Sequence, residues 1–231
     1  MNLYVDVGNT ALKMALDKGD SVESVSLSAI PWAQIKAVVV GQVGKRELLS
    51  DLINAAKTHN VGVVEANVSP TLKQLKCGYA LYQNLGIDRW LAVIACHYLY
   101  LNENVIIVDS GTATTVDGLT AAGQHLGGWI IPGLDMMSDS LTRHTQKVFS
   151  DLESPFAMEF GVNTPNAVKN GSLVSTLGCV VLAKSQYFQK EGCKVVFTGG
   201  YGALLQKHIE DAIFVKDLVL LGLKYWHQNQ G

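Results

Sequence analysis

The sequence lacks the features that mark a membrane protein or a nucleic-acid-binding protein. No apolar run approaches the ~20 residues that a membrane-spanning helix needs. The 20 acidic and 18 basic residues leave a formal net charge of −2, so nothing attracts the chain to nucleic acid or to an anionic membrane. The first residues carry no basic stretch followed by a cleavable apolar segment, and we therefore expect a cytoplasmic protein.

Cysteine and histidine give no sign of metal chemistry. The 4 cysteines and 6 histidines are scattered, with no Cys-x-x-Cys pair and no spacing typical of zinc ligands. We expect free thiols in a reducing compartment and no zinc site. At 231 residues, of which 48% are hydrophobic, the chain is long enough to bury the core of one large domain or of two smaller ones.

The most informative stretch is Asp6-Val7-Gly8-Asn9-Thr10, which follows an apolar, β-prone segment. Gly8-Asn9 is a strong hairpin signal, and residues 11–16 resume an apolar segment with one charge, Lys13. Backbone N–H groups in such a turn can converge on an anion, and a carboxylate at the strand end can hold Mg²⁺ through water. The stretch fits a phosphate site without a Walker lysine, and it fits an ordinary Gly-Asn hairpin equally well.

A second strand, turn and strand follow in the other half of the chain. The apolar segment 105–108 leads into Asp109-Ser110-Gly111-Thr112 and a returning strand that reaches 117. Two Asp-x-Gly turns, each after a buried strand near the start of its half, suggest a weak internal repeat. We expect two related α/β domains, 1–102 and 103–231, with a cleft between them into which each supplies a phosphate-binding hairpin.

A helix that is apolar on nearly every face is expected at 90–101, which fits burial between layers. Asp88 then falls at or next to its N-terminus, after a loop at 66–84 with little periodicity. The helix dipole and the free N–H groups there stabilise an ionised carboxylate, which suits a base used near neutral pH. The alternatives are a plain N-cap role for Asp88 and an interdomain salt bridge for Arg89.

The other segments continue an alternation of strands and helices. Strands are expected at 21–27, 36–40, 61–65, 124–131, 194–198 and 212–215, and helices at 45–59, 134–144, 203–208 and 217–227. A long helix should run to about residue 190, with Asn163 or Thr164 as N-cap and Pro165 as the first helical residue. Gly199-Gly200-Tyr201-Gly202, between a strand and a helix, would let a nucleotide approach the backbone closely.

Together these motifs resemble those of the type III pantothenate kinases, within the larger group of sugar kinases, actin and heat-shock chaperone ATPases. The resemblance covers nearly the whole chain and rests on the order and spacing of D-V-G-N-T, G-I-D-R, D-S-G-T-A, G-G-W-I-I-P-G, G-V-N-T and T-G-G-Y-G. It implies two duplicated actin-like (ribonuclease H-like) α/β domains and a homodimer. It also implies phosphorylation of pantothenate by ATP, the first step of coenzyme A biosynthesis.

The resemblance implies roles for particular residues. Those that would contact ATP are Asp6, Val7, Gly8, Asn9, Thr10, Ala11, Leu12, Lys13 and Thr112. Asp6 would hold Mg²⁺ through water, and Asp109 would help to hold a monovalent cation, K⁺ or NH₄⁺. Those that would surround pantothenate are Tyr79, Gly86, Ile87, Asp88, Arg89 and Thr164. Asp88 would be the general base that takes the proton from the primary hydroxyl of pantothenate.

Arg89 suits the pantothenate carboxylate or a phosphate oxygen, because its planar fork can pair with either through two hydrogen bonds. One departure from the family is local: Tyr82-Gln83-Asn84-Leu85 lacks the proline often found before Gly-x-Asp-Arg. Whether Tyr79 or Tyr82 faces the substrate is therefore open. Two other functions also stay open, a non-catalytic nucleotide-binding regulator on the same scaffold and a kinase for another small hydroxy acid.

Overall fold

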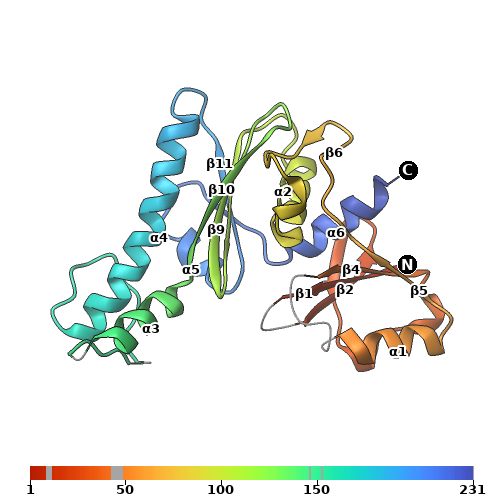
Figure 1. Ribbon diagram of the computed structural model, residues 1–231, viewed down its shortest axis with the longest axis horizontal. Coiled ribbons are helices and arrows are strands. Elements are labelled where there is room, and N and C mark those ends of the chain that lie inside the picture. Colours follow the sequence, from red (N-terminus) through yellow and green to blue (C-terminus); the bar gives the residue numbers. More distant parts are fainter. Residues whose placement is uncertain (9–11, 43–48, 146, 152, 231) are drawn as a thin grey trace. The chain divides into compact units, whose positions relative to one another are not determined.

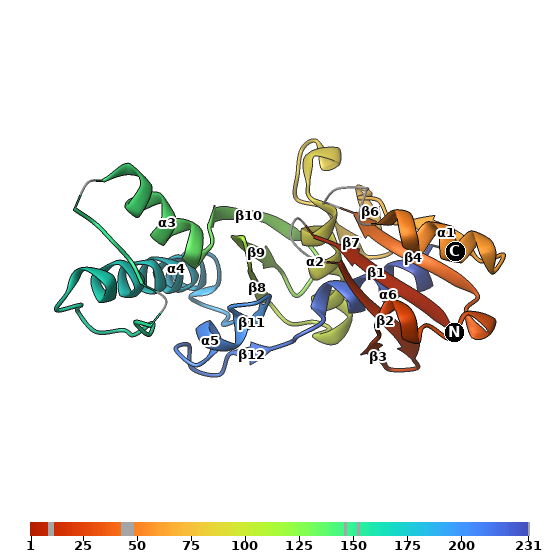
Figure 2. The ribbon, with the colours of Figure 1, turned by 90° about the horizontal axis from the view of Figure 1, so that it is seen from below.

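The computed structural model describes residues 1–8, 12–42, 49–145, 147–151 and 153–230. The described residues form two five-stranded sheets and a small two-stranded one (Figures 1 and 2). The strands of the first sheet are β1 (Asn2–Val7), β2 (Leu12–Lys18), β3 (Ser21–Ser24), β4 (Ala37–Gln42) and β5 (Gly62–Glu65). Those of the second are β8 (Val105–Ser110), β9 (Ala113–Leu119), β10 (His125–Pro132), β11 (Lys194–Thr198) and β12 (Ile213–Phe214).

Six α-helices occur in the described part of the chain. They are α1 (Ser50–Thr58), α2 (Ile87–Leu99), α3 (Leu134–His144), α4 (Thr164–Phe188), α5 (Gly202–Gln206) and α6 (Leu218–Gln228). The remaining elements are short: β6 (Thr71–Leu72) and β7 (Leu75–Lys76), which form the two-stranded sheet, and the 3₁₀ turns at Leu27–Ala29, Trp32–Gln34 and Tyr82–Asn84.

The two large sheets repeat one topology. The first has the order β3-β2-β1-β4-β5 and the second β10-β9-β8-β11-β12. In each, the central strand is antiparallel to the strand that follows it and parallel to the fourth strand of its set. Asp6 therefore lies in register between Lys13 and Gly41, as Asp109 lies between Thr115 and Thr198. The duplication expected from the two Asp-x-Gly turns is confirmed.

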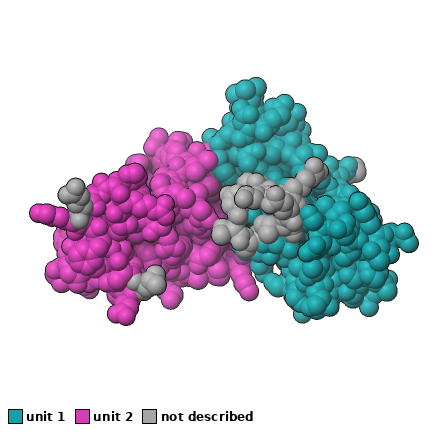
Figure 3. Space-filling view, turned by 60° about the horizontal axis from the view of Figure 1, so that its bottom comes forward, with its two compact units in different colours: residues 1–102, 120–127, 217–231 teal, residues 103–119, 128–216 magenta. Residues whose placement is uncertain are grey.

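Contacts divide the chain into two compact units, which Figure 3 colours separately. Unit 1 contains residues 1–102, 120–127 and 217–231, and unit 2 contains 103–119 and 128–216. One boundary between the units, at 102/103, coincides with the domain boundary expected from the sequence. The domain limits 1–102 and 103–231 remain a prediction. Unlike those expected domains, unit 1 also includes residues 120–127 and the segment of α6. Helix α6 belongs there because it packs extensively against α2.

The first sheet carries helices on both faces (Figure 1). Leu3, Val5 and Val7 of β1 alternate toward one face, where they form a buried cluster with Leu52 and Ala56 of α1. The opposite face meets α2 and α6, whose Leu91 and Leu223 lie closest to a Cβ built at Gly41. Since side chains alternate along a strand, Asp6 shares this second face with the buried Tyr4.

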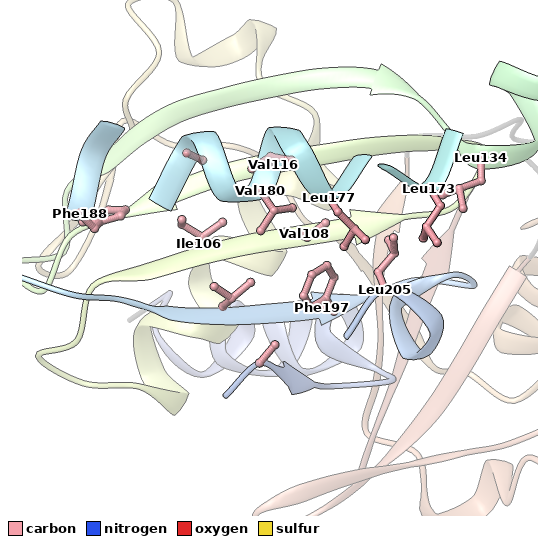
Figure 4. Packing of buried hydrophobic residues seen from close by; sticks show 13 residues of the cluster. Ile106, Val108, Val116, Leu134, Leu173, Leu177, Val180, Phe188, Phe197 and Leu205 are labelled. Atoms are coloured by element: carbon pink, nitrogen blue, oxygen red, sulfur yellow. The ribbon is translucent and has the colours of Figure 1, made fainter. Parts of the chain in front are cut away.

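The core of unit 2 lies between its sheet and the long helix α4. Figure 4 shows Leu177 and Val180 of α4 beside Ile106 and Val108 of β8, with Phe197 of β11 nearby, and all five are buried. Alternation along β8 then leaves Asp109 on the sheet face away from α4. In each half the aspartate at the end of the central strand therefore lies on the sheet face opposite the cluster that packs against α1 or α4.

Several predicted boundaries need correction. Helix α2 begins at Ile87 rather than near 90, and Gly86 is its N-cap, so the plain N-cap alternative for Asp88 is wrong. Strand β3 ends at Ser24. Of the helix predicted at 45–59, residues 45–48 lie outside the described residues, and α1 runs from Ser50 to Thr58. At the start of α4 the N-cap is Asn163, which leaves Thr164 and Pro165 as the first two helical residues. The predicted loop at 66–84 contains the hairpin of β6 and β7.

Candidate active site

The first turn of α2 holds Asp88. Its Oδ1 accepts a hydrogen bond from the backbone N–H of Arg89 at 2.8 Å, and a Cβ built at Gly86 would lie only 2.6 Å from the same oxygen. Glycine at the N-cap therefore leaves room for the carboxylate to lie over the start of the helix. The positive end of a helix dipole stabilises negative charge at this position, so the setting favours an ionised Asp88.

Arg89 and Tyr79 are in direct contact. Arg89 is 5% exposed, and its Nη1 donates a hydrogen bond of 2.7 Å to the hydroxyl of Tyr79. The guanidinium carbon also lies 5.4 Å from the centroid of the Tyr79 ring. A buried guanidinium fixed on one side by a phenol can direct its other N–H groups at a carboxylate. The structure thus brings Tyr79, Asp88 and Arg89 together.

A cavity of about 540 Å³ adjoins this turn in unit 1. It is lined by Gln42, Asn67, Val68, Gln83, Asn84, Leu85, Gly86 and Ile87. Sequence reasoning named Gly86 and Ile87 but missed the amides of Gln42 and Asn67. A signal was available, because Gln42 ends β4 and Asn67 follows β5, and ligands in α/β folds gather at the carboxyl ends of parallel strands.

In unit 2, Asp109 lies against the glycine loop that follows β11. Gly199 has a φ of +84°, and a Cβ there would collide with Asp109 Oδ1 and with the carbonyl of Ser110. The backbone N–H of Tyr201 donates to that same carbonyl at 3.0 Å. Only glycine accommodates both this backbone angle and the close approach of the carboxylate.

A cavity of about 470 Å³ opens beside this loop. Its lining comes from three segments: Gly111 and Thr112 of the β8–β9 turn, Gly200 and Tyr201 of the glycine loop, and Asp135, Met136, Asp139, Ser140, Arg143 and His144 of α3. The volume falls within the ~300–1,000 Å³ of typical ligand pockets. Thr112, predicted to contact the nucleotide, therefore lines a cavity that could hold a ligand of nucleotide size.

Tyr201 joins two walls of this cavity. Its hydroxyl donates to Asp135 Oδ1 at 2.6 Å, and its ring meets Phe156 edge-on at 5.7 Å. Burial, together with the hydrogen bond to Asp135, raises the pKa of Tyr201 from 10.0 to about 12. Tyr201 consequently stays neutral and holds one oxygen of Asp135 at physiological pH. Sequence reasoning named its loop but assigned Tyr201 and Asp135 no role.

The other predicted contacts are distributed over both units. Asp6 and Val7 end β1, Gly8 follows, and Leu12 and Lys13 begin β2; Asn9, Thr10 and Ala11 lie outside the described residues. Thr164 belongs to unit 2, at the start of α4, where the Asn163 side chain accepts from the N–H of Asn166 at 2.9 Å. The capping function expected here belongs to Asn163.

Within the described residues, no group of three or more His, Cys, Asp or Glu side chains could hold a metal ion by itself. A Mg²⁺ ion that arrives with nucleotide phosphates needs only one or two carboxylates, and the single aspartate at the end of β1 suits that mode. No helix in the same ranges is long and apolar enough to cross a membrane.

The duplicated sheets and the aspartate-bearing hairpins define the fold of the actin-like ATPases and sugar kinases. Two solved structures share it. One is described as a Baf family transcriptional activator from Campylobacter jejuni, with a TM-score of 0.61 and 23% identity over 98% of this chain and 97% of that one. The other is the activator of 2-hydroxyisocaproyl-CoA dehydratase from Clostridium difficile, with a TM-score of 0.50 and 15% identity over 99% and 95%. At such identities the likeness concerns the fold alone.

Sequence comparison narrows this class to one family. The sequence profile described as type III pantothenate kinase matches residues 17–183. A protein of that description from Pseudoalteromonas translucida is 47% identical over 99% of this chain and 97% of its own length. Another from Ectopseudomonas mendocina is 33% identical over 96% and 97%. The chain belongs to the type III pantothenate kinase family, which is a family of phosphotransferases.

Proposed function

We propose that this protein transfers the γ-phosphoryl group of ATP to the primary hydroxyl of pantothenate, with Asp88 as the general base. The observation that carries the proposal is the first turn of α2, where Asp88 and the buried Arg89 are adjacent. A general base must be ionised and within reach of the hydroxyl proton. The helix N-terminus favours the ionised form, and the cavity next to Gly86 and Ile87 offers room for the acceptor.

Pantothenate carries a carboxylate, an amide and hydroxyl groups, and the substrate side of unit 1 offers partners for each. Arg89, held by the Tyr79 hydroxyl, suits the carboxylate. Gln42 and Asn67 in the adjoining cavity suit amide and hydroxyl groups, since a side-chain amide both donates and accepts. The contact between Arg89 and Tyr79 favours Tyr79 over Tyr82 as the substrate-facing tyrosine. Thr164 completes the proposed set.

ATP would be held through its phosphates by the hairpin from Asp6 to Lys13 and by Thr112, with Asp6 holding Mg²⁺ through water. When bound, the metal bridges the phosphates and neutralises the charge that develops during transfer. Asp109 would contribute to the monovalent cation site for K⁺ or NH₄⁺. Its carboxylate packs against Gly199, at the edge of the cavity that Thr112 lines, where a cation could offset phosphate charge.

We also expect a cytoplasmic homodimer. One face of α4 exposes Val174, Val181 and Leu182, which are 44%, 55% and 54% exposed, and Gly171 and Gly178 beside them have open space around the Cα. These positions recur at helical spacing, so they form a continuous apolar stripe that a second copy could cover. Sedimentation of the wild type and of Val181→Lys tests this: the wild type should be dimeric and the variant monomeric.

The test of function is ADP release from purified protein with Mg-ATP, with and without pantothenate, in K⁺ buffer and again in Na⁺ buffer. Release that needs both pantothenate and K⁺ is the expected result. If folded protein shows no pantothenate-dependent release in either buffer, the kinase function is wrong for this substrate. ADP release with other small hydroxy acids in place of pantothenate then identifies a different acceptor, and no release with any of them leaves the nucleotide-binding regulator.

A further inference from the structure

The start of β10 belongs to unit 1 and lies beside the segment that leads to Tyr79. The backbone N–H of Lys76 donates to the carbonyl of Gly123 at 2.9 Å, and two residues later the N–H of Gly78 donates to His125 Nδ1 at 3.3 Å. A Cβ at Gly78 would collide with the carbonyl of His125. The approach is therefore so close that it requires glycine at 78.

His125 is fully buried and touches two aromatic residues of the substrate side. Its ring lies nearly parallel to that of Tyr79, with 6.3 Å between centroids and 8° between planes. The ring of Trp90, the residue after Arg89, is tilted by 51° to the imidazole, and the two ring centroids are 6.3 Å apart. Because Nδ1 accepts the hydrogen bond from Gly78, the neutral imidazole carries its proton on Nε2.

We propose that His125 is a positioning residue for pantothenate, acting through Tyr79 and Arg89. The imidazole fixes the backbone at Gly78 and supports one face of the Tyr79 ring, and the Tyr79 hydroxyl in turn holds the Arg89 guanidinium at 2.7 Å. The inference rests on the proposed function, in which Arg89 binds the substrate carboxylate. A misplaced Arg89 would weaken pantothenate binding and leave the nucleotide contacts intact.

Two variants each remove one of the two contacts of the imidazole. His125→Asn retains an acceptor near the position of Nδ1 and removes the ring that lies against Tyr79. His125→Phe retains a ring and leaves the N–H of Gly78 without its acceptor. The matched control is His97→Asn, which changes another buried histidine of unit 1, on α2, whose ring meets that of Tyr98. Steady-state kinetics should give KM for pantothenate, KM for ATP and kcat of each variant.

Both His125 variants should raise KM for pantothenate about tenfold, because small displacements of a binding group are costly. KM for ATP should stay within about twofold, as should both constants of His97→Asn. Tyr79→Phe removes only the hydroxyl that holds Arg89 and should also raise KM for pantothenate. Combining it with His125→Asn should add little, since both changes act on the same guanidinium.

The proposal is overturned if folded His125 variants keep the wild-type KM for pantothenate, or if KM for ATP rises as much. It is also overturned if Tyr79→Phe leaves KM for pantothenate unchanged, and this outcome does not depend on whether the His125 variants fold. Absence of pantothenate-dependent ADP release from the wild type would instead overturn the proposed function itself. The two failures are therefore distinguishable.

Discussion

The two halves of the sequence build the same sheet and use it differently. In each half a helix follows the fifth strand and carries an aspartate at its start: Asp88 in α2 and Asp217 in α6. Asp88 lies in the first turn of its helix, next to the buried Arg89 and a cavity. Asp217 is the N-cap of α6 and accepts no side-chain capping bond. A duplicated scaffold thus supplies equivalent positions, and the surroundings of each position decide which one can do chemistry.

The largest difference between the two halves is expected when each of the two helix-start aspartates is neutralised in turn. Asp88→Asn should lower kcat by about 10²–10⁴, the usual contribution of a general base, because the amide cannot take the proton of the hydroxyl. The fold should survive, since the amide oxygen can still accept from the N–H of Arg89. Asp217→Asn should leave kcat unchanged. A fully active Asp88→Asn enzyme, as folded as the wild type by circular dichroism, would contradict the general-base role.

The second comparison concerns Asp6 and Asp109, which occupy equivalent register positions. Asp6→Asn should lower kcat/KM for Mg-ATP by roughly 10²–10³, as expected when a preorganised charge beside the transferring phosphoryl group is lost. Asp109→Asn should have a smaller effect and should raise the K⁺ concentration required for half-maximal rate. The distinct roles are wrong if titrations of Mg²⁺ and K⁺ respond to the two variants in the same way.

The third comparison concerns packing. A Cβ at Gly222 of α6 would collide with the carbonyl of Leu91 in α2, whereas a Cβ at Gly62 of β5 meets nothing within 4 Å. Gly222→Ala should therefore force α6 away from α2 and cost about 1–3 kcal/mol. The melting temperature should fall by several degrees, since ~1 kcal/mol shifts a chain of this size by roughly 2–4 °C. Equal melting temperatures of Gly222→Ala and Gly62→Ala would contradict the close crossing of the helices.

The smallest effects concern two tyrosines that each donate to an aspartate. In unit 1, Tyr4 is fully buried and bonds Asp17 at 3.3 Å, where the buried Lys224 also lies 3.5 Å from the carboxylate. In unit 2, Tyr201 bonds Asp135 in the wall of the cavity. Tyr4→Phe should cost about 1 kcal/mol of stability without changing KM for ATP. Tyr201→Phe should raise KM for ATP by a few fold with little change in melting temperature.

Alkaline titration checks the same pair. Burial is the largest cause that raises the pKa of Tyr4 from 10.0 to about 12, and Tyr201 is raised to the same value. A raised folded pKa means that the stabilising contribution is complete below pH 10 and is lost as the pH rises through 12. The ultraviolet phenolate signal of each Phe variant should lack one late-titrating group. A variant that loses amplitude near pH 10 instead would contradict the assignment.

Sequence reasoning was most successful where structure is local. The segments 2–7, 105–108, 134–144 and 194–198 are strands or helices as predicted, because each combines a clear apolar pattern with turn residues at its ends. The start of α2 was placed too late, since Gly86 lacks the side chain by which caps are usually recognised. The cavity lined by Thr112 was only half anticipated. Its glycine and threonine turns are visible as motifs in the sequence, but the residues of α3 that complete its lining form no motif.

The sequence by itself determined the two strand-turn-strand motifs with their aspartates, the duplication, the family and the candidate residues, because these depend on neighbours in the chain. The tertiary structure alone decided that α6 packs on α2, that residues 120–127 belong with unit 1, and that His125 lies beside Tyr79. These contacts join segments far apart in the chain, and glycines at 78 and 222 permit them by removing a Cβ. Close packing of this kind has no periodic signal, since it depends on the fit of two distant surfaces.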